Sequence, residues 1–412
     1  MAALDIAGLS AVLKTQYTQK RVNVLTYPKN PMFAMVPKRT DFVGVNKVVA
    51  FQNAFGAGRS NVFSTALANI TGTVYNKVTV TRVHDYALAE ITGEAIDAAG
   101  TDGGSLLNAL KKEIDNAIKS CTRSLAIQLY RNSGGARGQL KAGISVTTPT
   151  ITLRNINDIT NFEQGMVLTT SAADGTSGAI RAGSVTIAGV DRDLGTITVT
   201  GNWDAGIAAV TANDYIFQQG DFVATAKQMV SGLAAWLPLV APVAGDNFFG
   251  LDRSVDTGRL AGIRYSAGSG GPIEESLISG ATQITTNGGT PDHAFMNPVD
   301  YANLIKALGS KVEYDMAIKS SNDASIAFKG VNLHGPAGEI KVVSDLNCPQ
   351  GYCYMLQMDT WNFETLKAAP RILEQDGMQI RANASADSYI LRAGWYGQLT
   401  CDAPGWNGVI TL

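Results

Sequence analysis

The sequence predicts a mixed α+β fold built around one long helix, and three observations indicate it. In residues 105–135, apolar residues recur at steps of three and four, from Leu107 to Leu129, as on one face of an amphipathic helix. Residues 43–92 hold two β-rich segments. Residues 137–220 contain short β segments and almost no helical periodicity. One dominant helix is therefore combined with several separate β regions.

The long helix has a start signal and a stop signal. The Ser105 hydroxyl can accept a free backbone N–H at the start, and Gly134 and Gly135 can end the helix, because glycine adopts the left-handed conformation at low steric cost. At 1.5 Å per residue the helix would be roughly 40 Å long, against an average of about 11–12 residues. We expect a spine across which other elements lie. An ordinary long core helix is the alternative.

Composition points to a chain whose surface is largely covered. The 412 residues are enough for two or three domains. The formal net charge is −2, so the chain as a whole lacks the positive charge that favours binding to nucleic acid. Charged residues make up only 17% of the chain, below the usual share of about a quarter. Other copies of the same chain are the simplest partners to cover this surface, so we expect a homo-oligomer.

The four cysteines, Cys121, Cys348, Cys353 and Cys401, form neither a C-x-x-C pair nor a metal-binding spacing with the three histidines. The favoured interpretation is that they are small buried apolar residues in a reducing compartment. A disulfide between Cys348 and Cys353, across the turn CPQGYC, is the alternative.

Residues 1–45 are expected to form an arm. A short helix is predicted at 9–20, and three prolines after it favour an extended path. Residues 1–47 hold seven Lys or Arg residues against two Asp residues. This excess suits contact with nucleic acid or an acidic partner surface. A merely solvated arm is the simpler interpretation.

Residues 43–92 are predicted to form one long hairpin. VGVNKVVAF leads outward and VYNKVTVTRV leads back, and the glycine-rich segment between them carries Phe55 and Phe63. An isolated two-stranded ribbon is only marginally stable in water. Nothing nearby in the chain offers a surface, so we expect a neighbouring subunit to cover the hairpin.

The β segments of 137–220 are separated by turn signals such as Asp174-Gly175. Short strands at such spacing are typical of a small β-barrel or β-sandwich. We expect this region to be a separate β unit inserted in a larger domain.

The clearest local signal in the second half is a strand at 293–296 followed by a helix at 298–308. Asn297 can cap this helix and Pro298 occupies its first position. Asp300 lies in the first turn, where the helix dipole favours an acid.

Helices are also predicted at 221–236 and 272–279. A strand, a turn and a further strand are predicted from 338 to 363. The tail, 388–412, is expected to be a last pair of strands.

Motifs of the common enzyme classes are missing from the sequence. It contains no G-x-x-x-x-G-K-[ST], no G-x-S-x-G and no H-E-x-x-H, and His84, His293 and His334 are scattered. We therefore predict no catalytic, cofactor-binding or metal site, no cofactor and no enzymatic activity.

No membrane segment is expected either. The start of the chain lacks the basic region of a signal peptide. The longest uncharged run, 228–245, contains two prolines and is at the short limit for a membrane span, so we interpret it as buried protein.

The order of these predicted elements resembles that in the major capsid protein of tailed bacteriophages, whose Hong Kong 97-type fold also occurs in encapsulins. MNPVDYANLIKAL, at 296–308, is similar to the family's strand-to-helix segment in its axial domain. IKVVSDLNCPQGYCYMLQMDTWNF resembles the strands that follow it, and SYILRAGWYGQLTCDAPGWNGVI resembles the closing peripheral strands. The resemblance covers nearly the whole chain apart from 137–220.

The resemblance implies a division of the chain into six parts. They are an N-terminal arm at 1–45, an extended hairpin called the E-loop at 46–92, a peripheral domain with the spine helix at 93–136, an inserted β domain at 137–220, an axial domain at 221–345, and returning peripheral strands with a three-fold loop at 346–412.

The resemblance also implies a function. The chain would be a structural protein of the virion that self-assembles, as hexamers and pentamers, into the icosahedral head shell around phage double-stranded DNA. Portal and scaffolding proteins are expected partners, a decoration or cement protein is a further candidate, and contact with DNA would be non-specific. Assembly would take place in the cytoplasm of the host bacterium.

Two features depart from the family pattern. No charged helical leader of about a hundred residues precedes the arm, and Met1 favours a separate scaffolding protein over an internal one. Some family members also form a Lys–Asn isopeptide crosslink with the help of a Glu. Lys47 and Lys77 lie in or near the E-loop, but the partner residues cannot be mapped, so we expect no crosslinking.

The expected assembly contacts lie in the E-loop and in the loop 366–388. They are Phe51, Phe55, Arg59, Phe63 and Lys77 in the former and Arg371, Glu374, Asp376 and Arg381 in the latter. Mixed charges in the second loop suit repeated, reciprocal contacts between copies. The remaining alternatives are an encapsulin-like compartment shell, a β-rich phage tail or adhesin protein, and a cytosolic enzyme.

Overall fold

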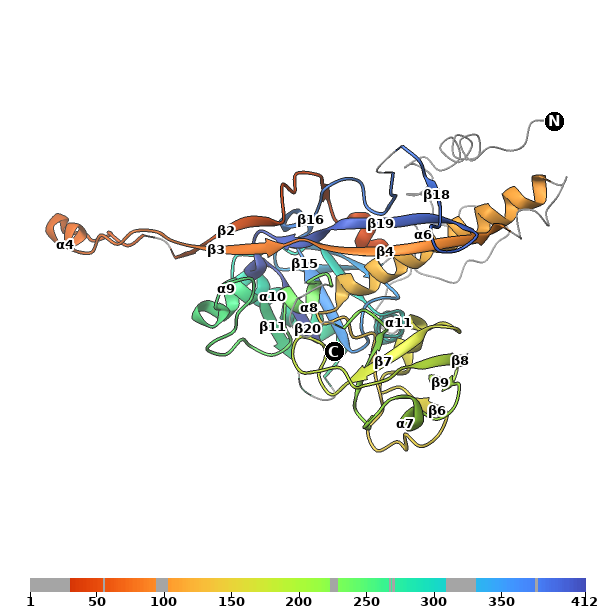
Figure 1. The fold of residues 1–412 in the computed structure, drawn as a ribbon. Coiled ribbons are helices and arrows are strands. Elements are labelled where there is room, and N and C mark those ends of the chain that lie inside the picture. The colour runs from red at the N-terminus through yellow and green to blue at the C-terminus, as the bar shows by residue number, and fades with distance from the viewer. Residues whose placement is uncertain are drawn as a thin grey trace, which may run out of the picture.

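The structure, a computed structural model, describes residues 30–54, 56–93, 103–222, 229–266, 268, 271–308, 331–374 and 377–412. These residues form three six-stranded sheets, one two-stranded hairpin and the helices around them (Figure 1). The mixed α+β class is therefore confirmed. The predicted helix at 9–20 and the basic arm before residue 30 lie outside the described residues.

The long helix α6 (Gly103–Tyr130) is confirmed. Its buried side chains continue the predicted apolar stripe; they include Ile114, Ala117, Ile118, Cys121, Leu125 and Leu129. The predicted ends are wrong. Ser105 lies inside the helix, and the helix ends at Tyr130, before the two glycines. A side chain on Gly134 would collide with the backbone carbonyl of Asp174, so this glycine permits a close contact between chain segments.

The first sheet combines strands from both ends of the chain. Its central strand β19 (Ser388–Cys401) pairs with β4 (Val83–Thr92), β16 (Trp361–Thr365), β17 (Arg371–Ile372) and β18 (Ile380–Ala382), and β1 (Lys38–Arg39) pairs with β16. Helix α6 packs on one face of β4 and β19 through a shared apolar cluster that includes Ala89, Ile118, Leu391 and Ala393. The short helix α3 (Pro31–Met35) places Phe33 against Phe363.

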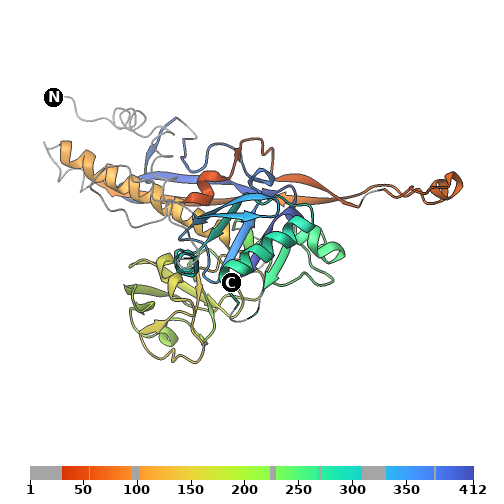
Figure 2. The ribbon, with the colours of Figure 1, turned by 180° about the vertical axis from the view of Figure 1, so that it is seen from behind.

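The second sheet has the strand order β11 (Ile263–Ser266), β20 (Gly408–Thr411), β15 (Tyr352–Leu356), β12 (His293–Met296), β14 (Gly338–Ser344), β13 (Val331–Gly335). Figure 2 shows α10 (Ile273–Thr286) along this sheet. The two strands predicted in the tail are confirmed as β19 and β20, and they belong to different sheets.

The strand-to-helix signal is confirmed by β12 and α11 (Pro298–Leu308). The Asn297 side chain accepts the backbone N–H of Val299 at 3.0 Å, which is the predicted cap. Asp300 has a role that its position in the first turn did not indicate: its carboxylate accepts the backbone N–H of Gly351 at 2.7 Å. It therefore fixes the turn between β14 and β15 against the helix.

Two helix predictions need correction. In the described part of 221–236, the helix is α8 (Leu233–Trp236) alone, because Gly232 packs directly on carbonyl oxygens at the end of α6. The helix predicted at 272–279 continues to Thr286 as α10. Short helices complete this region; they are η3 (Arg253–Asp256), α9 (Thr257–Ala261), η4 (Met358–Thr360) and η5 (Pro404–Trp406).

The hairpin consists of β2 (Asn46–Ala54) and β3 (Val74–Thr81), with α4 (Phe63–Ala68) near its tip. The prediction is confirmed for these two strands. It is wrong for 83–92, which leaves the hairpin as β4 and pairs with β19 along its whole length. The hairpin extends far from the body of the molecule, and α4 lies at its outer end (Figure 1).

The third sheet lies within 138–218 and has the order β5 (Gly138–Gln139), β10 (Tyr215–Gln218), β7 (Val167–Ser171), β8 (Val185–Asp191), β9 (Thr196–Val199), β6 (Thr150–Thr152). A bridge between Leu140 and Leu153 joins the two end strands, which closes the sheet into a small barrel. The helices η2 (Ile156–Asn161) and α7 (Trp203–Gly206) lie in its connections. The division of the chain into domains stays a prediction.

Candidate assembly surfaces

The outer end of the hairpin carries an apolar stripe that the described chain leaves uncovered. Phe63, Leu67 and Ile70 are 83%, 59% and 65% exposed, and no residue of α4 is buried. Phe63 and Leu67 are four residues apart and lie on one face of α4, and Ile70 follows directly after the residue that caps the helix, Asn69. We call these three residues the tip stripe.

The neck below the tip is closed by two hydrogen bonds between Ala57 and Thr71. The N–H of Thr71 donates to the Ala57 carbonyl at 2.7 Å, and the N–H of Ala57 donates to the Thr71 hydroxyl at 2.9 Å. The tip stripe is thus presented on a defined loop. An exposed apolar patch of this kind marks an interaction surface.

The base of the hairpin has the opposite character. Val78 and Val80 are buried, and Phe51 is 6% exposed and packs against Trp236 at a ring distance of 6.5 Å. The backbone N–H of Thr79 donates to the Phe249 carbonyl at 3.1 Å. The chain itself therefore covers the base. Phe51 is therefore not available for the predicted contact with a neighbouring subunit, because its side chain is buried in the core of its own subunit.

An ion-pair cluster ties the hairpin base to the first sheet. Lys47 lies 2.8 Å from the Glu364 carboxylate and 3.3 Å from that of Asp41. The Glu364 side chain is 2% exposed, and burial, together with the neighbouring Asp41, raises its pKa. Lys47 is thus engaged within its own chain, on the buried side of the hairpin.

The other predicted hairpin contacts have different surroundings. Arg59 and Lys77 are exposed. Phe55 lies outside the described residues. Of the three hairpin phenylalanines predicted as contacts, Phe63 is thus the one that the structure describes as exposed.

The face of the first sheet that points away from α6 carries a second exposed patch. Tyr86 and Leu88 on β4 are 49% and 63% exposed. The Tyr86 hydroxyl lies 3.3 Å from that of Tyr396 on β19, and the ring of His84 lies 5.2 Å from that of Tyr86. We call His84, Tyr86, Leu88 and Tyr396 the sheet patch.

The sheet patch combines apolar surface with a charge. The Arg82 guanidinium lies 5.9 Å from the Tyr396 ring, within the range of a cation–π contact. Partial burial and the hydrogen bond with Tyr396 raise the pKa of Tyr86 to about 12. Tyr86 is therefore neutral at physiological pH, and the patch suits an apolar or aromatic partner surface.

The segment predicted as a three-fold loop is partly ordered by the first sheet. Arg371 and Arg381 lie in β17 and β18 and are half-buried, because both strands pair with β19. Glu374 is exposed and accepts a hydrogen bond from Gln379. Asp376 lies outside the described residues.

All four cysteines are free and buried. The interpretation of small buried residues is confirmed, and the alternative of a disulfide between Cys348 and Cys353 is wrong. Within the described residues, no group of three His, Cys, Asp or Glu side chains could hold a metal ion. No helix in that part of the chain is long and apolar enough to cross a membrane.

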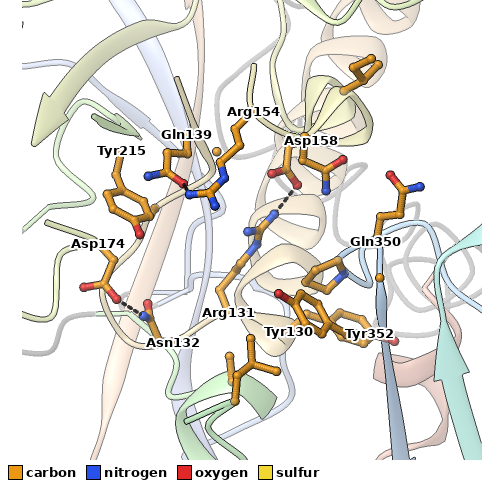
Figure 3. A pocket seen from close by; sticks show the side chains of 18 of the residues that line it. Tyr130, Arg131, Asn132, Gln139, Arg154, Asp158, Asp174, Tyr215, Gln350 and Tyr352 are labelled. Atoms are coloured by element: carbon orange, nitrogen blue, oxygen red, sulfur yellow. Dashed lines mark hydrogen bonds and ion pairs between the residues drawn. The ribbon is translucent and has the colours of Figure 1, made fainter. Parts of the chain in front are cut away.

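A cleft of about 740 Å³ separates the barrel from the end of α6 and the turn at 349–352. Figure 3 shows polar side chains on both walls, with Arg131 directed to Asp158 and Asn132 directed to Asp174. Its lining contains no histidine, cysteine, serine or lysine. The charged groups that line it are arginine and aspartate side chains.

Comparison with solved structures identifies the fold. The capsid asymmetric unit of cyanophage A-1(L) is 13% identical to this chain, with a TM-score of 0.53, and the match covers 93% of this chain and 92% of the cyanophage chain. The fold is that of phage capsid proteins. No family model and no curated protein matches the sequence.

Other solved structures match this chain at lower scores. The capsid of a native GTA particle is 8% identical, with a TM-score of 0.47 and coverage of 94% of this chain and 91% of that chain. The SrpI encapsulin complex from Synechococcus elongatus PCC 7942 is 8% identical, with a TM-score of 0.41 and coverage of 100% and 96%.

In this capsid-type fold, Phe63 is an expected contact, but neither surface as a whole is predicted, although the sequence carries signals for both. The tip stripe follows the spacing Phe63, Leu67, Ile70 in the glycine-rich segment between the two predicted strands. The alternation His84, Tyr86, Leu88 marks one face of a strand. Its partner strand β19 was needed to show which face is exposed.

Proposed function

We propose that this chain is the major capsid protein of a tailed phage, a structural and non-enzymatic protein that self-assembles into the icosahedral head shell around double-stranded DNA. The main observation behind the proposal is the projecting hairpin, because no residue of the described chain covers its apolar tip stripe. Similarity to the cyanophage capsid protein over nearly the whole chain supports it.

The contact that would build the shell joins the tip stripe of one subunit to the sheet patch of the next. Both surfaces are apolar at their centres, since Phe63 and Leu67 would meet Tyr86 and Leu88. Fully burying one such side chain contributes about 1.5–3 kcal/mol. Repeated around a closed shell, contacts of this size add up through multivalency.

The parts of the molecule then take the roles of a Hong Kong 97-type subunit. The hairpin 46–81 corresponds to the E-loop, α6 and the first sheet to the peripheral domain, and the second sheet with α10 and α11 to the axial domain. The barrel at 138–218 would be an inserted domain. Arg59, Lys77, Arg371, Glu374 and Arg381 remain proposed contacts between copies.

The partners follow from the same proposal. The chain would form hexamers and pentamers, meet a portal and a scaffolding protein, and contact packaged DNA without sequence preference. A decoration protein is a further candidate. The protein would be part of the virion and would be assembled in the cytoplasm of the host bacterium.

Expression followed by negative-stain electron microscopy tests this function. The chain is produced alone and together with a candidate scaffolding protein, and the particles are imaged. Closed shells tens of nanometres across are expected. Monomers or small oligomers under both conditions would contradict the proposal, and tubes or fibres would favour a tail protein.

A further inference from the structure

Three arginines lie together on the first sheet, beside the sheet patch. Arg392 lies on β19 itself. Arg371, on β17, pairs with Gly394 of β19. Arg381, on β18, pairs with Ile390 of β19. Directly paired residues project from the same face of a sheet, and positions 390, 392 and 394 are alternate residues of one strand, so the three arginines share a face. We call them the arginine row.

The arginine row points away from α6. The residues next to it in the three strands, Ile372, Ile380 and Leu391, belong to the apolar cluster that α6 covers. Successive side chains of a strand point to opposite faces, so the arginines lie on the uncovered side of the sheet (Figure 1). Arg392 is exposed, and the other two arginines are half-buried.

The charge of the row is not balanced by its surroundings. The side chains of Arg371 and Arg392 make no hydrogen bond or ion pair within the part of the chain that the structure describes. Among the paired residues of these strands, Glu90 is the carboxylate that the register places on the same face, and it accepts the hydroxyl of Ser388. Glu374, which follows β17, accepts a hydrogen bond of its own. A surface of this kind suits an anionic partner.

Two other segments of the chain cannot supply that negative charge from a neighbouring copy. Residues 42–84, which include the whole hairpin, contain no Asp or Glu. Residues 1–29 contain one acid, Asp5, against four Lys or Arg residues. Neither a neighbour's hairpin nor its N-terminal arm therefore complements the arginine row.

The spacing of the row narrows the choice of partner. Alternate residues of a strand lie about 6–7 Å apart, so successive arginines are offset by this distance along β19. An extended peptide with an acidic residue at every second position presents its carboxylates at the same interval. The sequence of this chain contains no three Asp or Glu residues at alternate positions. The spacing therefore points to a different protein.

We propose that the arginine row binds an extended acidic segment of another protein, with carboxylates at alternate positions. Each guanidinium can hold one carboxylate through two parallel hydrogen bonds. The segment would lie along β19, next to the sheet patch, since Arg392 and Leu88 are direct partners in the sheet. The inference does not depend on the proposed capsid function, because binding can be measured on the unassembled chain.

Peptide binding to the full chain, measured by fluorescence anisotropy, tests the proposal. The probe is a labelled peptide of alternating glutamate and threonine. One control peptide has glutamine in place of glutamate, and the other has the same glutamates and threonines in two separate blocks. The alternating peptide should bind about thirtyfold more tightly than the glutamine peptide, because each of three exposed ion pairs contributes about threefold. It should also bind more tightly than the block peptide.

A variant of the row locates the binding. Arg392→Gln should weaken binding of the alternating peptide about threefold. Its thermal unfolding should match that of the unaltered chain, because the side chain has no partner to lose in the described residues. Arg154→Gln, which removes an exposed arginine of the barrel, is the matched control and should leave peptide binding unchanged.

Four outcomes would overturn the proposal. Equal binding of the alternating and block peptides would show that the spacing of the row is not recognised. Equal affinity of Arg392→Gln and the unaltered chain would place the peptide elsewhere. A labelled DNA duplex that binds more tightly than the alternating peptide, and that also depends on Arg392, would assign the row to nucleic acid. A changed oligomeric state of Arg392→Gln with unchanged peptide binding would assign the row to contacts between copies.

Discussion

Two phenylalanines of one hairpin have opposite surroundings. Phe63, on α4, is 83% exposed, whereas Phe51, on β2, is 6% exposed because Trp236 and the loop at 248–249 cover it. Both are apolar residues in or beside a glycine-rich segment, and no local sequence signal distinguishes their surroundings. What separates them is a contact with Trp236, which lies far along the chain.

Replacing the tip stripe should abolish assembly without affecting the fold of the subunit. In the double variant Phe63→Asp/Leu67→Asp, two charges would have to be buried at the proposed contact, which is strongly unfavourable. Stability should change by less than about 0.5 kcal/mol, as is usual for exposed sites. Electron microscopy of particles and thermal unfolding of the subunit measure the two effects.

Thr65→Asp is the matched control, since Thr65 is exposed on the same helix but lies off the stripe. This variant should still form closed shells. Normal shells from the double variant would show that the tip stripe is not a contact between subunits.

A single buried amide connects the two sheets of the body. Asn407 is fully buried; its side-chain oxygen accepts the Trp361 indole N–H and the Gln357 backbone N–H, each at 2.8 Å. Asn407→Ala would leave both donors unpaired in the core. Because each buried unpaired group costs about 1–3 kcal/mol, we expect a loss of about 3 kcal/mol in chemical denaturation.

Asn287→Ala serves as the control for Asn407. Its amide donates only to the Gln283 carbonyl, and the residue is exposed at the end of α10. A loss below about 1 kcal/mol is expected there. Equal losses at the two positions would refute the role assigned to Asn407.

At the scale of elements, the hairpin is held to the first sheet by the ion pair of Lys47 and Glu364. Lys47→Met should cost about 1–3 kcal/mol at pH 8, because Glu364 would remain buried without its partner. Glu364→Gln in the same chain should restore most of this loss. Urea denaturation of the single and double variants measures the coupling.

The cost of Lys47→Met should also depend on pH. Burial raises the pKa of Glu364, so the carboxyl takes up a proton more readily in the folded chain than in the unfolded one, and the neutral form no longer needs the lysine. The loss should therefore shrink as the pH falls from 8 toward 5. A loss of the same size at both pH values would contradict this account of the pair.

Elements with complete local signals were predicted from the sequence. Helix α6 has a continuous apolar stripe, and α11 has its own cap in Asn297. Strand β4 was assigned to the wrong partner because nothing within 83–92 shows that β19, some three hundred residues later, is the strand it pairs with. The exposed tip helix α4 was missed because no residue of it is buried by the part of the chain that the structure describes.

At the scale of the whole molecule, the central claim is that the hairpin of one subunit lies on the first sheet of the next. Disulfide trapping tests it most directly, because all four native cysteines are buried. Chains carrying Leu67→Cys and chains carrying Leu88→Cys are assembled together, oxidised and separated on a denaturing gel. We predict covalent dimers in the mixture and none with either variant alone; closed shells without covalent dimers would contradict the account.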